Sequence, residues 1–261
     1  MPDSPPIRIA LSGASGRMGR ALARLAAETS GCAIAGGIAR TTGPGVVTVD
    51  DAGPLLAAMD VLIDVSAPAQ LTAILSEHGD RLEGRALVVG TTGLDADLEA
   101  ALDGLAEHTA VLVAANFSLG VNLLLDLARR AAAVLPGQQF DVEVVEAHHR
   151  AKADAPSGTA LALARAVAEG RGEQLEGLRR DGRSGRTGAR PVNEIGLHAI
   201  RGGGVVGEHR VLFLGTRERI ELVHGALDRD VFAEGALAAA RWVAGRAPGR
   251  FGMADVLGMG V

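Results

Sequence analysis

The chain has 261 residues, 48% of them hydrophobic, which is enough for one large domain or two modest ones at roughly 100–200 residues per domain. A formal net charge of −5 and only five Phe, one Trp and no Tyr argue against a nucleic-acid partner. Cys32 is the single cysteine, so no intrachain disulfide can form. No apolar stretch approaches the roughly 18 residues of a membrane span, and we expect a cytoplasmic protein without membrane or nucleic-acid partners.

Short apolar runs alternate with helix-length amphipathic segments in the first half of the chain, which is typical of a parallel sheet with crossover helices. The expected strands are Ile7–Ser12, Cys32–Ile38, Val61–Val65, Ala86–Gly90 and Ala110–Ala115. The expected helices are Gly16–Glu28, Leu55–Met59, Pro68–His78 and Asp95–Glu107. This pattern predicts an α/β fold, a Rossmann-like doubly wound parallel sheet whose ligand lies outside the carboxyl ends of the strands.

The second half has a different pattern. A long apolar helix, Gly120–Leu135, precedes an alternating strand, Phe140–Ala147, and the Gly- and Arg-rich stretch Arg179–Arg190 is expected to be a mobile surface loop. Three strands then follow without long helices between them, which predicts a second α+β domain with a mixed sheet: Ile195–Arg201, Val211–Gly215 and Ile220–His224. The final helix, Val231–Ala244, and the tail Met253–Leu257 are compatible with either domain.

A glycine-spaced turn joins the first strand to the first helix. Gly13 permits a tight turn, Gly16 permits close approach of a pyrophosphate, and Gly19 permits close packing of helix on strand. A glycine loop alone is weak support, but here the required strand and helix flank it. We therefore expect cofactor contacts from Gly13, Ala14, Ser15, Gly16, Arg17 and Met18.

The second strand ends in Ala39 and Arg40, without the acidic residue that usually binds the ribose 2′-hydroxyl of NAD about 20 positions after the glycines. An arginine there can pair with the 2′-phosphate of NADP, or it can simply lie on a solvated loop. We expect NADPH to be preferred over NADH.

Two further polar turns follow predicted strands and are expected to face the nicotinamide half of the cofactor, although each could equally be a plain turn. They are Gly90, Thr91 and Thr92 after one strand, and Ala115, Asn116, Phe117 and Ser118 after the next.

The densest reactive chemistry lies in residues 146–159, where two histidines, an arginine and Lys152, the only lysine of the chain, precede a helix start. Histidine titrates near neutrality and a lysine among cations can donate a proton, while the helix N-terminus suits a carboxylate. Metal binding is a weaker alternative, because adjacent histidines on a strand point to opposite faces. A solvated loop with chance histidines is another.

These segments, together with Asn122, Gly202–His209 and the closing Asp255–Leu257, resemble the 4-hydroxy-tetrahydrodipicolinate reductase family over nearly the whole chain. The resemblance implies NAD(P)H-dependent reduction of a small anionic imine dicarboxylate in lysine and diaminopimelate biosynthesis, by a homotetramer. It implies a dinucleotide-binding domain of residues 1–118 and 230–261 and a substrate-binding and oligomerisation domain of residues 119–229.

The resemblance also implies roles for single residues. His148 would be the proton donor and acceptor, Lys152 a proton donor, and the substrate contacts would be His149, Ser157, Gly158 and Thr159. Three positions depart from the family pattern: Ala39 lacks the acidic side chain, Ala151 replaces a third histidine, and Val65 replaces an aromatic residue. None of them removes a proposed proton donor.

Two other functions compete with this interpretation. One is a dehydrogenase of another amino-acid precursor with the same kind of nucleotide domain, and the other is a non-catalytic NADPH-binding sensor. The complete 146–159 stretch argues against both, although a fold alone does not decide function.

Overall fold

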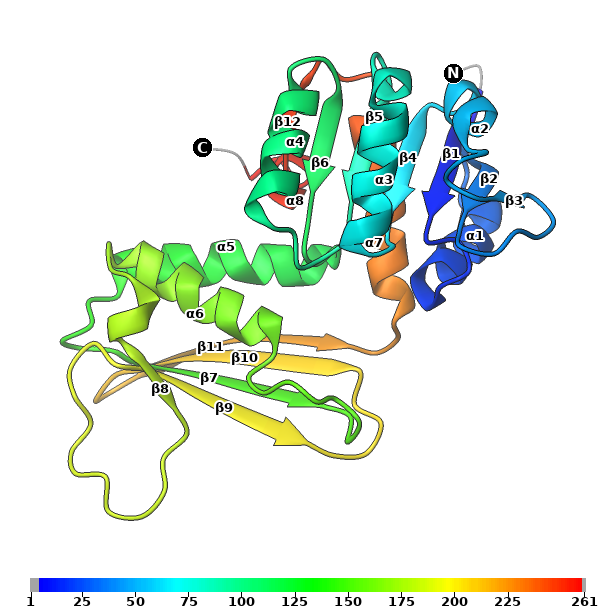
Figure 1. The fold of residues 1–261 in the computed structure, drawn as a ribbon. Helices are drawn as coiled ribbons and strands as arrows, with labels where there is room; N and C mark the ends of the chain where they lie inside the picture. Colours follow the sequence, from blue (N-terminus) through cyan, green and yellow to red (C-terminus); the bar gives the residue numbers. More distant parts are fainter. Residues whose placement is uncertain (1–4, 260–261) are drawn as a thin grey trace. The chain divides into compact units, whose positions relative to one another are not determined.

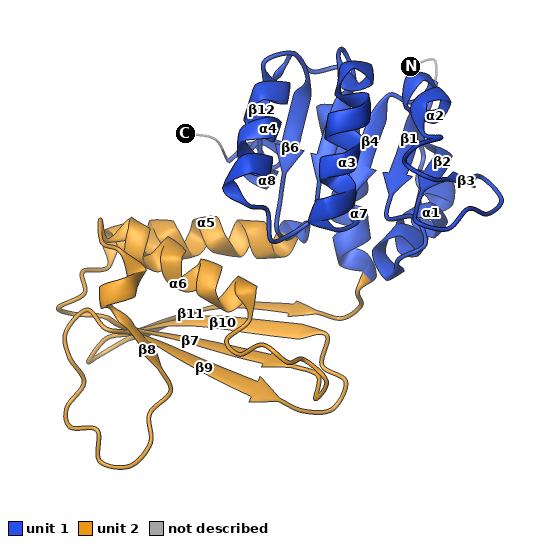
Figure 2. Ribbon diagram, in the orientation of Figure 1, with its two compact units in different colours: residues 1–119, 230–261 blue, residues 120–229 orange. Residues whose placement is uncertain are grey.

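The computed structural model describes residues 5–259, so the terminal residues 1–4 and 260–261 of the predicted nucleotide domain lie outside it. The chain forms two compact units (Figure 2). Unit 1 contains Met1–Leu119 and Asp230–Val261, and unit 2 contains Gly120–Arg229.

Unit 1 is built on a seven-stranded sheet with the order β12-β6-β5-β4-β1-β2-β3, in which every pair of neighbours is parallel (Figure 1). Its strands are β1 Ile7–Ser12, β2 Cys32–Ile38, β3 Val46–Val47, β4 Val61–Asp64, β5 Ala86–Val89, β6 Ala110–Val113 and β12 Gly249–Phe251. The chain runs outward from β1 to β3 and then returns to β4. The strand order therefore reverses between β1 and β4, which is where such sheets bind ligands.

Helices cover both faces of this sheet. One face is covered by α1 (Arg17–Glu28) and α7 (Asp230–Val243). The other face is covered by α2 (Gly53–Ala58), α3 (Pro68–His78), the short helix η1 (Gly79–Leu82) and α4 (Ala96–Ala106). Successive strand residues alternate between the two cores, as the pleat requires. The short helix α8 (Met253–Val256) follows β12.

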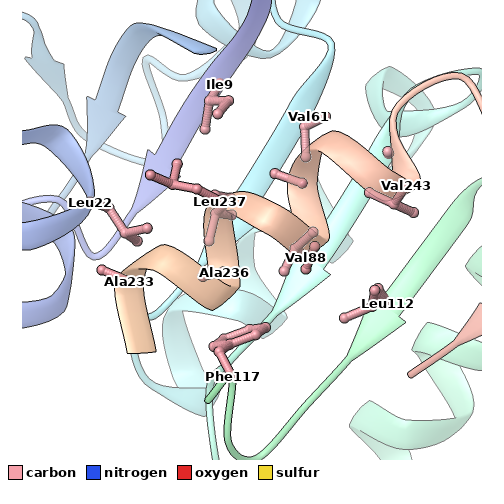
Figure 3. Packing of buried hydrophobic residues seen from close by; sticks show 14 of the residues in the cluster. Ile9, Leu22, Val61, Val88, Leu112, Phe117, Ala233, Ala236, Leu237 and Val243 are labelled. Atoms are coloured by element: carbon pink, nitrogen blue, oxygen red, sulfur yellow. The ribbon is translucent and has the colours of Figure 1, made fainter. Parts of the chain in front are cut away.

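The alanine-rich helix α7 lies close against the sheet of unit 1. Figure 3 shows Ala236 and Leu237 of α7 among strand residues such as Ile9 and Val88, all of them buried. A Cβ atom on Gly235 would lie 1.9 Å from the carbonyl oxygen of Phe117, so only glycine allows this approach. Helix α7 therefore belongs to unit 1, which answers a question that the pattern of the sequence left open.

Unit 2 contains a five-stranded mixed sheet with the order β11-β10-β7-β9-β8. β10 is antiparallel to β7 and β11, whereas β9 is parallel to β7 and β8. Its elements, with α5 starting at the unit boundary, are α5 Leu119–Val134, β7 Asp141–His148, α6 Gly158–Gly170, η2 Leu175–Gly177, β8 Arg179–Asp181, β9 Ile195–Arg201, β10 Gly207–Leu214 and β11 Arg219–Ala226. The predicted fold class, a parallel doubly wound sheet plus a mixed-sheet α+β domain, is confirmed.

The two faces of the mixed sheet differ. Val144, Val211 and Phe213 pack with α5 and α6 in one core cluster. The opposite face carries Ile200 and Val223, which are 55% and 58% exposed. Among the described residues of unit 2, no helix packs on that second face (Figure 1).

Some predicted elements were wrong in extent. The stretch Arg179–Arg190, expected to be a loop throughout, begins with the strand β8, whose three exposed residues are held by backbone pairing to β9. The two-residue β3 and three-residue β12 were missed, and β10 and β11 are longer than expected. Such short or exposed strands lack the apolar alternation on which the prediction depends. No helix among the described residues is long and apolar enough to cross a membrane.

Candidate active site

The glycine turn of unit 1 is shaped by close backbone contacts. Gly13 has φ +82°, and a Cβ atom there would lie 2.7 Å from the carbonyl oxygen of Val65, which directly follows β4. A Cβ atom on Gly19 would lie 2.4 Å from the carbonyl oxygen of Gly13. The turn therefore sits where the strand order reverses, and it requires glycine at both positions.

The start of α1 is suited to an anion. Gly16 is the N-cap, no side chain caps the helix, and no acidic residue lies in its first turn. Ser15, Gly16 and Arg17 are exposed there. The uncapped, exposed N-terminus of the helix fits the pyrophosphate of a dinucleotide.

A buried carboxylate, Asp64, ties the ends of β4 and β5 together. Its oxygens accept hydrogen bonds from the hydroxyls of Ser66 at 2.6 Å and of Thr91 at 2.5 Å. Burial raises the pKa of Asp64, and the hydroxyl hydrogen bonds oppose this shift. The side chain of Thr91 is therefore occupied inside the protein, whereas Thr92 is exposed. Sequence reasoning placed Asp64 in a strand and missed this role.

The two polar turns after β5 and β6 pack against each other. A Cβ atom on Gly90 would lie 2.4 Å from the ring of Phe117, which is buried in the core, and Ser118 is buried beside it. Asn116 accepts a hydrogen bond from the backbone of Ser118 at 2.9 Å, while Ala115 is exposed. Arg40 is exposed at the end of β2. In unit 1 the exposed predicted residues are therefore Ser15, Gly16, Arg17, Arg40, Thr92 and Ala115.

In unit 2, the last residue of β7 is His148, and its Nδ1 atom lies 2.7 Å from Oε2 of Glu146. Glu146 is 1% exposed and also accepts two hydrogen bonds of 2.7 Å from Arg201 and one of 3.0 Å from the backbone N–H of Ser157. Burial raises the pKa of Glu146, but hydrogen bonds from Arg201 and His148 hold it below its usual range. The carboxylate is therefore ionised at neutral pH.

The helix that follows this segment begins as the sequence predicts. Ser157 is the N-cap of α6, and its hydroxyl accepts a hydrogen bond of 3.1 Å from the backbone N–H of Ala160. Ser157 is 2% exposed, so its side chain serves the cap, whereas Gly158 is exposed and Thr159 is half-buried at the helix start. Helix starts of this kind favour a carboxylate group.

Lys152 and His149 of this segment have side-chain partners within unit 2. Lys152 forms an ion pair of 2.9 Å with Asp154, and its side chain is 21% exposed. Arg229 donates a hydrogen bond of 3.1 Å to Nε2 of His149. Among the residues described, no group of three or more His, Cys, Asp and Glu side chains could hold a metal ion.

Family models match both parts of the chain. Residues 7–117 match the model described as "Dihydrodipicolinate reductase, N-terminus", and residues 120–257 match "Dihydrodipicolinate reductase, C-terminus". The chain belongs to the dihydrodipicolinate reductase family. It is thus an NAD(P)H-dependent oxidoreductase, and the family predicted from the sequence is confirmed.

Individual relatives agree with this membership. The chain is 46% identical over 257 residues to 4-hydroxy-tetrahydrodipicolinate reductase of Caulobacter vibrioides, covering 98% of both chains. It is 47% identical to the enzyme of the same name from Parvibaculum lavamentivorans, covering 97% of this chain and 98% of that one. A dipicolinate-bound dihydrodipicolinate reductase from Paenisporosarcina sp. TG-14 shares its fold, with a TM-score of 0.75 at 23% identity over 96% of this chain and 98% of that one.

Several residues that surround His148 in this dihydrodipicolinate reductase family member were missed by sequence reasoning. Arg201 lies on β9 and His209 on β10, and the register of the sheet places His209 opposite Glu146. A Cβ atom on Gly207 would lie 3.1 Å from Nε2 of His148. A weak signal existed, because the segment Gly202–His209 contributed to the family resemblance.

Proposed function

We propose that the protein reduces 4-hydroxy-tetrahydrodipicolinate, through its dehydrated imine, to tetrahydrodipicolinate in lysine and diaminopimelate biosynthesis. The identity of 46–47% over nearly the full length of enzymes with this name carries the proposal. The His148–Thr159 segment supports it, because it combines proton donors with a helix start suited to a carboxylate.

The cofactor has a suitable place on unit 1. The predicted contacts are Gly13, Ala14, Ser15, Gly16, Arg17 and Met18 for the pyrophosphate, Arg40 for the adenosine end, and residues 90–92 and 115–118 for the nicotinamide end. NAD(P)H bound there supplies a hydride. Thr91, Phe117 and Ser118 act through the shape and backbone of their turns, since their side chains are buried.

Two side chains are assigned to the proton that the reduction requires. The ring nitrogen of the imine gains negative charge during the reaction, and a proton must neutralise it. His148 and Lys152 are the catalytic residues in this assignment, with Lys152 held by Asp154. His149, Ser157, Gly158 and Thr159 bind the dicarboxylate, with Ser157 fixing the helix start through its cap.

An assay tests this function directly. The purified protein is mixed with NADPH and the imine made in situ from aspartate semialdehyde and pyruvate, and NADPH oxidation is followed. We expect oxidation that depends on the imine. Tight NADPH binding without turnover would contradict the proposal and favour a cofactor sensor, and faster turnover of an aspartate or homoserine derivative would favour a different dehydrogenase.

NADPH is the preferred cofactor in this proposal. Arg40 is exposed at the end of β2, and its neighbour Ala39 provides no carboxylate that would repel a 2′-phosphate. We expect kcat/KM to be higher with NADPH than with NADH. Arg40→Ala should reduce this preference for NADPH, whereas Arg20→Ala, on the exposed side of α1, should leave the preference unchanged. A strong NADH preference of the wild-type protein would contradict it.

A homotetramer and a cytoplasmic location complete the proposal. The face of the mixed sheet that carries the exposed side chains of Ile200 and Val223 is available to another copy of the chain. Sedimentation should give the mass of four 26.6 kDa chains, and Val223→Glu should lower it. A monomeric wild-type protein would contradict the tetramer, and fractionation of expressing cells tests the location.

A further inference from the structure

Three buried polar side chains gather around His148 within unit 2. Glu146 lies on β7, Ser157 caps α6, and His209 lies on β10; they are 1%, 2% and 4% exposed. Glu146 and His209 are direct neighbours across the sheet. The two side chains therefore project from the same face, the one on which α6 packs.

The carboxylate of Glu146 determines which nitrogen of His148 carries hydrogen. An ionised carboxylate only accepts hydrogen bonds, so the contact of 2.7 Å requires a hydrogen on Nδ1 of His148. The other nitrogen, Nε2, then carries the free lone pair when the ring is neutral. When the ring is protonated, Nε2 carries the hydrogen that can be donated. Gly207 leaves room beside Nε2, because a Cβ atom at that position would lie 3.1 Å from it.

Arg201 fixes the carboxylate in turn. Its two terminal nitrogens contact both oxygens of Glu146 at 2.7 Å, and one of them also donates to the carbonyl oxygen of Asp154 at 2.6 Å. This bidentate geometry leaves Glu146 little freedom to rotate. It also connects β7, β9 and the loop that carries Lys152.

We propose that Glu146, clamped by Arg201, is a positioning residue that fixes hydrogen on Nδ1 of His148 and presents Nε2 as the atom that exchanges a proton with the substrate. This inference rests on the proposed function for the identity of the substrate and for the assignment of His148 as a proton donor. The proton moves between Nε2 and the substrate, and Glu146 remains ionised throughout.

His209 adds no charge of its own next to His148 at physiological pH. Its ring meets that of His148 edge to face, with centroids 5.2 Å apart, and its Nε2 lies 3.3 Å from the hydroxyl of Ser157. Burial, together with the positive charges of His148 and Lys152, lowers the pKa of His209 to about 4, so it is neutral at physiological pH. Burial likewise lowers the pKa of His224, the next histidine along this face.

Several elements supply the charged groups around His148. These groups are Glu146 on β7, Arg201 on β9, and Lys152 and Asp154 on the loop before α6. Removal of Glu146 takes away the anion that stabilises the protonated imidazole, whereas removal of Arg201 leaves that anion uncompensated. The two substitutions must shift the pH dependence of the reaction in opposite directions.

Nuclear magnetic resonance of histidine-labelled protein tests the tautomer without any substrate. In the wild-type protein, neutral His148 should carry its hydrogen on Nδ1. In Glu146→Gln, a substantial fraction should carry it on Nε2. A wild-type ring with hydrogen on Nε2, or a Glu146→Gln ring identical to the wild type, would overturn the proposal whether or not the protein turns over the imine.

The kinetic test uses a control on the same strand. Glu143 also accepts a hydrogen bond of 2.7 Å from a histidine, His198, and contacts two arginines, but it lies on the other face of the sheet. For Glu146→Gln we expect kcat to fall by up to about 100-fold, the lower end of what a proton donor contributes, and the basic limb of the kcat profile to move about one pH unit lower. Glu143→Gln should leave the position of that limb unchanged.

Two further variants separate positioning from folding. Arg201→Met should move the basic limb of the kcat profile to higher pH. Glu146→Asp keeps the charge but shortens the reach to His148, so it should lower kcat. Circular dichroism should show that the Glu146→Asp variant is folded. Equal shifts in the Glu143 and Glu146 variants would indicate a structural effect and overturn the positioning role. Absence of wild-type turnover would instead overturn the proposed function, and the tautomer measurement would still decide the positioning role.

Discussion

Thr91 donates a hydrogen bond of 2.5 Å from its hydroxyl to Oδ2 of Asp64, two residues that lie 27 positions apart in sequence. Asp64 is the last residue of β4, and Thr91 follows the neighbouring strand β5. On the β1 side, Gln70 donates a hydrogen bond of 2.8 Å to the hydroxyl of Ser12, the last residue of that strand. Polar contacts inside the protein thus hold the strand ends that surround the predicted cofactor site.

The buried carboxyl of Asp64 should make stability depend on pH. Because its folded-state pKa is raised, its contribution is fully present below the ordinary value of 3.8 and is lost as pH rises through the raised value. Asp64→Asn should therefore reduce the decline in the free energy of unfolding above pH 3.8, measured by urea titration at several pH values. Asp97→Asn, an exposed residue of α4, is the control, and an unchanged slope in Asp64→Asn would contradict the prediction.

Gly19→Ala should damage the cofactor turn. Its Cβ atom would lie 2.4 Å from the carbonyl oxygen of Gly13 and 2.7 Å from Cα of Ala14, and overpacking of this kind costs about 1–3 kcal/mol. We expect a lower free energy of unfolding and weaker NADPH binding by calorimetry. Gly104→Ala in α4 meets nothing within 4 Å and should stabilise the protein by up to about 1 kcal/mol. Equal effects of the two substitutions would contradict this view of the turn.

Lys152→Ala should lower kcat by about 100- to 10,000-fold, the range expected for loss of a proton donor, with little change in the Kd for NADPH. Lys152→Arg is the matched variant, because it can retain the charge next to Asp154 but does not release a proton. Steady-state kinetics and cofactor titration separate the two effects. Unchanged turnover in either variant would remove Lys152 from the catalytic residues.

Arg190 should anchor the loop of residues 182–194. Its guanidinium donates to Glu143 at 3.0 Å, to Asp141 at 2.7 Å and to the carbonyl oxygen of Val142 at 3.0 Å. Arg190→Ala removes all three contacts with β7, and we expect faster cleavage within the loop by a non-specific protease. Arg186→Ala, at an exposed position of the same loop, should leave the cleavage rate unchanged. Equal rates in wild type and Arg190→Ala would show that the loop is held in another way.

The elements that sequence reasoning predicted to the residue have strong local signals. They are Ile7–Ser12, Cys32–Ile38, Pro68–His78 and Ile195–Arg201. The first two strands are apolar runs next to turn residues, and the helix starts at a proline, which suits the first helical position. Strands such as β3 and β12 depend on backbone pairing with distant partners, which leaves no local pattern to detect.

The site was predictable only where its residues are close in sequence. His148, Lys152 and Ser157 lie in one segment, and so they were found together. Arg201 lies 55 positions from Glu146, and His209 lies 52 positions from Ser157. Only the pairing of β7 with β9 and β10 brings these groups together, and sheet register cannot be derived from one sequence without knowing the partners of each strand.

The return of the chain from unit 2 to α7 and β12 has a consequence for biosynthesis on the ribosome. Ala236, Leu237 and Val243 belong to the core that α1 and α7 form with the sheet, yet they are translated after all of unit 2. A nascent chain that ends before α7 therefore has an unshielded apolar sheet surface, whereas unit 2 is continuous and can fold as soon as Arg229 has left the exit tunnel. The nucleotide-binding half of the molecule must mature last, although its synthesis begins first.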